Sequence, residues 1–166
     1  MSKQRLKAER TITGHGGFTL IELIMVIVIM GILGVYTFSF LSNTIGAYMK
    51  VEGHKILYDE GRQAMEYMVL ELRDANQNAS ITTGTSSIAF TRSNPSATSI
   101  TYSLSGGTLN RVSGGSTNAL AGNVTAFTPS VSGSAPNQTV TLNLTISSTG
   151  SGTLYFRTTV YPRNIS

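Results

Sequence analysis

The sequence predicts an α+β fold in which one long N-terminal helix packs on a C-terminal antiparallel β-sheet. Three observations predict it. An apolar run from Leu23 to Leu41 contains no ionisable side chain except the phenol of Tyr36. An amphipathic pattern with helical spacing follows as far as Ala75, and beyond it apolar and polar residues alternate with a period of two. The pattern thus indicates a helix with a membrane half and an amphipathic half, followed by strands.

The first element is a short basic leader followed by a membrane-length helix. Four cations precede the apolar run: Lys3, Arg5, Lys7 and Arg10. The first charges after the run are Lys50 and Glu52. Residues 23–41 would span about 28 Å as a helix, which is close to one bilayer core. Because the flank with excess positive charge stays cytoplasmic, we expect the C-terminal part to be exported.

A secretory signal peptide is the competing interpretation of this N-terminus. Its apolar core would be shorter, however, and its small residues would follow the core, whereas Gly16 and Gly17 precede it. Glycine has no Cβ and lets the backbone lie extended in a protease cleft. These glycines would suit a cut between Gly17 and Phe18, which would leave the membrane helix on the product.

Glu22 is the one carboxylate at the edge of this apolar segment. A charge at the end of a membrane helix is expensive and marks a functional candidate. The alternative is a purely local role, in which Glu22 lies in the headgroup layer and is favoured by the positive end of the helix dipole. Both interpretations place Glu22 in the first turn of the helix.

The helix is expected to continue from Phe18 to about Asn78, which would make it near 90 Å long. Gly31 and Gly34 are its weak points, since glycine is unfavourable in a helix. One apolar stripe marks the second half of the helix: Ile56, Leu57, Ala64, Met65, Met68, Val69, Leu72 and Ala75.

The chain after Asp74 contains no Asp or Glu and is rich in Ser, Thr, Asn and Gly. Three segments alternate at period two and predict strands: Ile100, Tyr102 and Leu104; Val140, Leu142, Leu144 and Ile146; and Leu154, Phe156, Thr158 and Val160. Turns are expected at 106–107 and 150–152. We expect one sheet of about four to seven strands, with loops at 113–118 and 132–138.

Little in the exported part indicates chemistry, so we predict neither an enzyme nor a cofactor or metal site. The chain has no cysteine, and His54, the one histidine beyond the expected cleavage point, is expected to be solvated. No acid follows Asp74 to bind calcium. The carboxylates Asp59, Glu60 and Glu66 are expected to be solvated on the helix.

The basic balance of the chain does not indicate a polyanion partner. The formal charge is +4, but four of the cations belong to the leader, and residues 18–166 carry eight Lys and Arg against seven Asp and Glu. Four arginines are scattered over the predicted strands, where we expect them on the solvent side: Arg92, Arg111, Arg157 and Arg163. We predict no nucleic acid partner.

The stretch Gly16-Gly17-Phe18-Thr19-Leu20-Ile21-Glu22, with the apolar run after it, resembles the processing signal of type IV prepilins and type II secretion pseudopilins. The resemblance implies cleavage after Gly17 by prepilin peptidase and methylation of the new amino terminus of Phe18. It also implies that Glu22 attracts the N-terminal amine of a neighbouring subunit and so sets the axial register of a filament. The predicted fold is therefore pilin-like.

Looser motifs resemble the larger minor components of these systems, namely J-type pseudopilins, W-type minor pilins and the O-type minor pilin of mannose-sensitive haemagglutinin pili. They lie at 62–65, 71–75, 87–90, 102–109 and 160–164. Many major pilins close a C-terminal loop with a disulfide, and a chain without cysteine departs from that pattern. A minor pilin or pseudopilin is the favoured interpretation.

The resulting prediction divides the chain into a leader at 1–17, a membrane and polymerisation half-helix at 18–41, an amphipathic half at 42–79 and an exported β-domain at 80–166. The resemblance implies an inner-membrane location, then a pilus or pseudopilus. The expected partners are prepilin peptidase, other pilins, an inner-membrane assembly platform and the bilayer. The alternative is a single-pass membrane protein whose exported domain binds a ligand and never polymerises.

Overall fold

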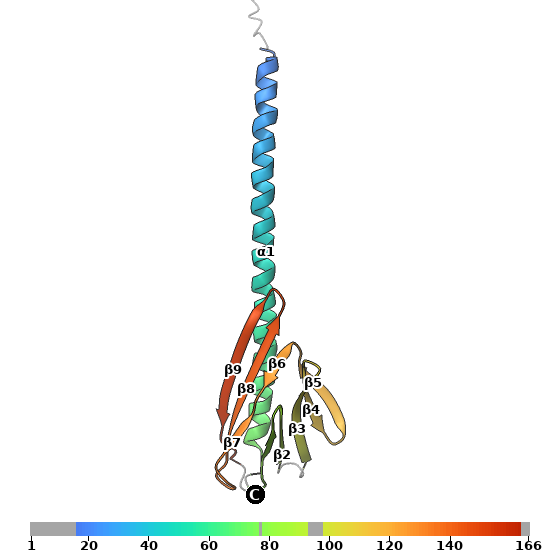
Figure 1. Ribbon diagram of the computed structural model, residues 1–166, viewed down its shortest axis with the longest axis vertical. Helices are drawn as coiled ribbons and strands as arrows, with labels where there is room; N and C mark the ends of the chain where they lie inside the picture. Colours follow the sequence, from blue (N-terminus) through green and yellow to red (C-terminus); the bar gives the residue numbers. More distant parts are fainter. Residues whose placement is uncertain (1–15, 77, 93–97, 164–166) are drawn as a thin grey trace, which may run out of the picture. The chain divides into compact units, whose positions relative to one another are not determined.

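A computed structural model describes residues 16–76, 78–92 and 98–163. The chain divides into two units, residues 1–45 and residues 46–166, and each is described by itself. Helix α1 (Leu20–Arg73) contributes to both units, and all the strands lie in the second. Figure 1 labels α1 and the strands from β2 to β9.

In the first unit, α1 is apolar on all sides. Every described residue from Gly16 to Ile45 is exposed, and α1 contains a stretch long and apolar enough to cross a membrane. Its few hydroxyl groups include Thr37 and Thr44, which donate to the carbonyl oxygens of Leu33 and Phe40 at 2.7 and 2.9 Å. Such bonds satisfy a polar side chain without water.

In the second unit, α1 buries one face, formed by Leu57, Gly61, Ala64, Met65, Met68, Glu71 and Leu72. The predicted stripe is confirmed for most of its members, but Ile56 is 60% exposed. The reason is geometric: Ile56 precedes Leu57 by one residue, and each residue turns the helix by about 100°.

The helix ends at Arg73, five residues before the predicted end at Asn78. Ala75 forms an isolated antiparallel bridge with Arg92, and the amide of Asn76 donates to the carbonyl oxygen of Thr91 at 2.8 Å. The amide of Ala75 still donates to the carbonyl oxygen of Leu72 at 3.2 Å, but the amide of Asn76 is satisfied by β2 instead of by the preceding helical turn. Pairing with a distant strand therefore ended a helix that local sequence alone would extend.

The first sheet is antiparallel with strand order β1-β2-β3-β4-β5. Its strands are β1 (Thr82–Gly84), β2 (Ser87–Arg92), β3 (Thr98–Ser105), β4 (Thr108–Ser113) and β5 (Ser116–Ala121). Gly106 and Gly107 turn the chain between β3 and β4 at φ of 57° and 76°, as predicted. The predicted loop at 113–118 is wrong, since Gly114 and Gly115 alone connect β4 to β5.

The second sheet is centred on β8 (Thr139–Ser148). Along one edge β8 pairs with β6 (Val124–Phe127) and β7 (Ser130–Ser132), and it also pairs along its length with β9 (Gly152–Val160). The described residues thus form nine strands in two sheets, where the sequence predicted about four to seven strands in one. Short strands such as β1 and β7 carry too few residues to show a period.

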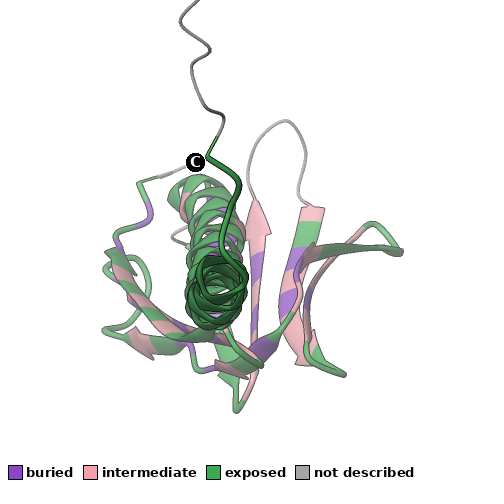
Figure 2. Cartoon of the chain, turned by 90° about the horizontal axis from the view of Figure 1, so that it is seen from above, coloured by how far each residue is buried: buried purple, intermediate pink, exposed green. Residues whose placement is uncertain are grey.

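The core lies between α1 and the two sheets, and the predicted alternation of the strands is confirmed. Val140, Leu142, Leu144 and Ile146 are all fully buried. Figure 2 shows buried segments on strands of both sheets. Buried Gln138 accepts from the amide of Ile81 and donates to a backbone carbonyl, so it fixes the segment before β1. The α+β pilin-like fold predicted from the sequence is therefore the observed one.

Candidate processing and assembly segment

Thr19 caps the N-terminus of α1. The amide of Glu22 approaches both the Thr19 carbonyl oxygen, at 3.1 Å, and its hydroxyl, at 3.3 Å. The pattern Thr-x-x-Glu is that of a capping box, in which the residue three positions after the cap is Glu or Gln. Glu22 also lies in the first turn of α1, where the helix dipole favours an anion. Glu22 therefore has a local role, which is to stabilise the N-terminus of α1.

The predicted cleavage residues lie before the helix, in backbone without regular structure. Gly16, Gly17 and Phe18 are exposed, and the Phe18 side chain is 79% accessible. A Cβ placed on either glycine would meet no heavy atom within 4 Å. The Gly17–Phe18 peptide bond is therefore accessible and lies outside regular structure.

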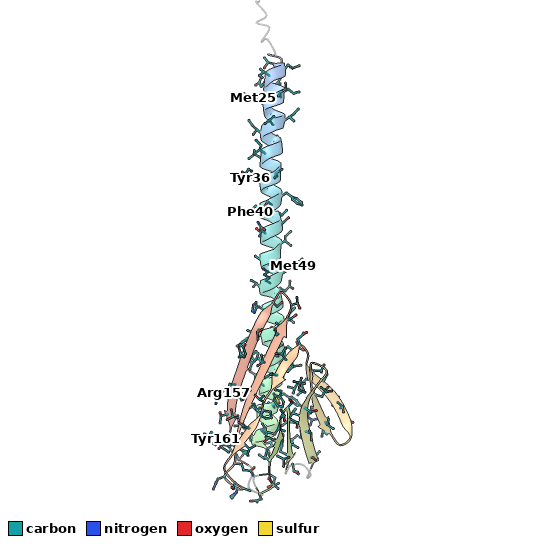
Figure 3. All side chains as sticks on the ribbon, in the orientation of Figure 1. Met25, Tyr36, Phe40, Met49, Arg157 and Tyr161 are labelled. Atoms are coloured by element: carbon teal, nitrogen blue, oxygen red, sulfur yellow. The ribbon has the colours of Figure 1, made fainter. Side chains whose placement is uncertain are left out.

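The helix that follows Glu22 presents large apolar side chains in every direction. Figure 3 shows the side chains along this helix, with Met25, Tyr36 and Phe40 labelled. All three are more than 60% exposed. A helix that is apolar all round belongs in lipid or among partner helices, so this surface suits a membrane or a helical assembly.

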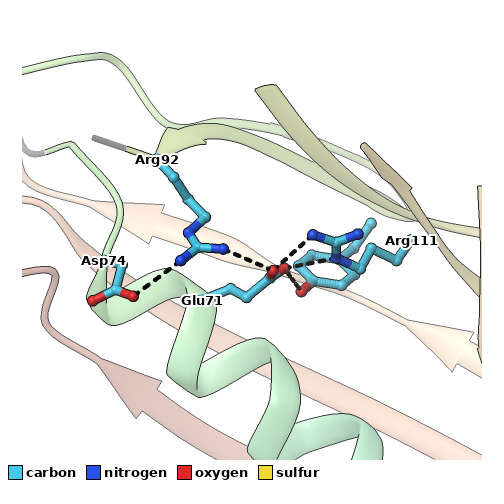
Figure 4. Close-up of polar contacts among 5 residues, drawn as sticks. Glu71, Asp74, Arg92 and Arg111 are labelled. Carbon is cyan, nitrogen blue, oxygen red and sulfur yellow. Dashed lines mark hydrogen bonds and ion pairs between the residues drawn. The ribbon is translucent and has the colours of Figure 1, made fainter. Parts of the chain in front are cut away.

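A cluster of charged residues joins α1 to the first sheet in the second unit. Glu71 accepts from Arg111 at 2.8 and 2.9 Å and from the hydroxyl of Tyr102. Arg92 lies between Glu71 and Asp74, at 3.4 Å from each. Figure 4 shows these contacts converging on Glu71. Glu71 is only 6% exposed, so its buried negative charge is held by two cations and a hydroxyl.

These contacts change the ionisation of the cluster. Burial alone would raise the pKa of Glu71, but the hydrogen bonds from Arg111 and Tyr102 and the charges of the arginines outweigh it and lower that pKa. Burial and the bond to Glu71 raise the pKa of Tyr102, and the same carboxylate raises the pKa of Arg111. Glu71 is therefore a carboxylate, and Tyr102 a neutral donor, throughout the neutral range.

The structure contradicts the sequence predictions for three charged residues. Arg92 and Arg111 lie partly buried on Glu71 instead of on the solvent side. Glu60 accepts from the backbone amide of Gly122 at 2.5 Å and is not simply solvated. His54 is exposed, as predicted. A signal for Glu71 was present, because it follows Met68 by three residues and so lies on the buried stripe.

Within the described residues, no group of three or more His, Cys, Asp or Glu side chains lies together at metal-binding spacing. The second unit is a packed domain held by an apolar core and by the ionic cluster around Glu71. The exposed features of the N-terminal segment are the Gly16-Gly17 pair, the carboxylate of Glu22 in the first helical turn and the apolar helix.

Comparison with known proteins supports this interpretation of the N-terminus. Residues 13–37 match the family model described as the prokaryotic N-terminal methylation motif. No curated protein and no solved structure matches the chain. The motif supports membership of a type IV pilin-like class, whose proteins are structural and not catalytic. It implies processing by prepilin peptidase and assembly with other pilins.

Proposed function

We propose that the chain is a minor pilin or pseudopilin that is assembled into, or primes assembly of, a type IV pilus or a type II secretion pseudopilus. The observation that carries the proposal is the methylation-motif match at 13–37, in which Glu22 is the acid at the start of an exposed apolar helix. Prepilin peptidase removes residues 1–17 and the new amine of Phe18 is methylated. Residues 18–41 anchor the subunit in the inner membrane, and the β-domain is exported.

In this proposal Glu22 pairs with the methylated amine of Phe18 on a neighbouring subunit. If Glu22 paired with the Phe18 amine of its own subunit, neither charge would be left to attract a neighbour. A pair between two subunits instead fixes how far one is displaced from the other along the filament axis. In lipid, an unpaired carboxylate is expensive, so a subunit is driven to dock where its Glu22 finds an amine. The inner-membrane assembly platform then extracts the subunit.

Substitutions at Glu22 separate the assembly role from the capping role. Glu22→Gln keeps a side chain that a capping box accepts but removes the charge. We expect this variant to be processed and inserted normally and to lose incorporation into filaments and pull-down of partner pilins. Glu22→Asp keeps the charge and should retain part of the incorporation. Normal incorporation of Glu22→Gln would contradict the register role.

The same experiment distinguishes the alternative, a single-pass protein that never polymerises. Such a protein would be absent from sheared filament fractions whatever residue stands at position 22. For a pilin-like subunit, the wild-type protein would be present in that fraction and the Glu22→Gln variant would be absent from it. The amounts of the two proteins in the membrane fraction would be equal.

A further inference from the structure

Strand β9 is an edge strand along its whole length. It pairs with β8 from Gly152 to Val160, and among the described residues no strand pairs with its other edge. Alternate residues of an antiparallel edge strand direct their N–H and C=O groups away from the sheet, which makes a template for another strand. Edges of this kind carry peptide recognition in proteins that bind an added strand.

The core is incompletely covered beside this edge. Val69, Leu154 and Phe156 are only partly buried although they pack on the core, and Leu70 is 61% exposed. An open groove runs here between α1 and β9, lined by Met65, Glu66, Val69, Leu70, Arg73 and Thr158. An added strand would place alternate side chains in this groove, so every second residue of the occupant is apolar.

The outer face of β9 has the opposite character. Tyr155, Arg157 and Thr159 are exposed on it, and Tyr155 is 80% accessible. Figure 3 labels Arg157 and, beyond the end of β9, Tyr161. Within the described part of the chain, neither Arg157 nor Arg73 has an acid within ion-pair distance. Glu66 in the groove is already held by Arg62 at 2.7 Å.

Charge therefore decides which strand can be added. Cross-strand neighbours lie about 5 Å apart, and opposite charges there are favourable whereas like charges are not. No Asp or Glu occurs from residue 75 to the end of the chain. A strand from a second copy would thus bring no carboxylate to Arg157, and antiparallel pairing of β9 with itself would bring arginine toward arginine.

We propose that the free edge of β9 binds an extended segment of a different protein, in which apolar residues alternate with carboxylates. The apolar side chains enter the groove beside Val69 and Leu70, and the carboxylates lie on the outer face opposite Arg157. This interaction goes beyond the proposed function and depends neither on cleavage nor on polymerisation. A non-polymerising membrane protein with this domain would bind the same segment.

The test uses the full chain in detergent micelles and two capped model peptides, one alternating valine with glutamate and the other valine with lysine. Saturating glutamate peptide should slow hydrogen exchange of the amides in 152–160, and the lysine peptide should bind more weakly. Arg157→Glu should weaken binding of the glutamate peptide about fivefold and should strengthen binding of the lysine peptide. Lys50→Glu, an exposed charge reversal on α1, is the matched control and should change neither affinity.

A glutamate peptide carrying N-methyl groups on alternate residues tests the backbone contacts, because it cannot donate to the β9 edge. It should not bind. The proposal is overturned if the glutamate peptide leaves exchange in 152–160 unchanged, if Arg157→Glu does not reverse the preference, or if the N-methylated peptide binds equally well.

Discussion

The Tyr102 hydroxyl of β3 donates a hydrogen bond to Glu71 of α1 across the interior of the second unit. Tyr102 is fully buried, and Arg111 holds the same carboxylate from β4. The last turns of α1 are thus tied to two neighbouring strands of the first sheet by one acid. Since no other carboxylate is buried among the described residues, the stability of this contact rests on Glu71.

Replacing Glu71 by Gln should destabilise the second unit by about 3–5 kcal/mol, because it leaves Arg111 partly buried without its anion and leaves Arg92 with Asp74 alone. The free energy of unfolding in urea measures the effect. Glu66→Gln is the matched control, since its pair with Arg62 is 60% exposed on both sides and should contribute about 1 kcal/mol or less. Equal losses for the two variants would show that the cluster is not a buried ionic contact.

The same cluster predicts an acid-dependent loss of stability. The pKa of Glu71 lies below its ordinary value of 4.5 in the folded unit, so the unfolded chain takes up a proton first. The contribution of Glu71 is therefore complete above pH 4.5 and is lost as the pH falls through the lowered pKa. Between pH 7 and pH 3, the midpoint temperature of thermal unfolding should fall more steeply for the wild type than for Glu71→Gln. Parallel curves would contradict the assignment.

Gly61→Ala should destabilise the second unit by about 1–3 kcal/mol through overpacking. A Cβ at this position would collide with the Phe156 ring and would lie 2.9 Å from the Ile146 side chain. Gly46→Ala is the control, because a Cβ there would meet nothing within 4 Å and alanine favours a helix. Chemical denaturation should separate the two, with Gly46→Ala as stable as the wild type or more so.

Periodicity predicted much of this fold. Long strands such as β8 alternate strictly and were visible in the sequence, and so was the buried stripe of α1. The early end of α1 was not visible, because it depends on pairing of Ala75 with Arg92 far along the chain. The division into two sheets was also hidden, since a period of two shows which face is buried but not which strands pair.

The functional residues, like the fold, could be predicted from the sequence only in part. Gly16, Gly17, Phe18 and Glu22 are recognised from sequence because processing signals are local, and their proposed roles remain predictions. The Glu71 cluster is distributed over α1, β2, β3 and β4, so its partners could not be identified without the fold. The position of Glu71 on an apolar stripe, followed by strands with arginines and no acid, is the signal that such a cluster leaves.

The measurement that tests the central claim most directly is the intact mass and N-terminal sequence of the protein recovered from its native membrane. The pilin-like account predicts a chain that begins at Phe18 with a methylated amine, because the methylation motif spans this bond. A mature chain that begins at Met1 or Ser2 would contradict it, since an unprocessed subunit would have neither the free amine of Phe18 nor a partner for Glu22.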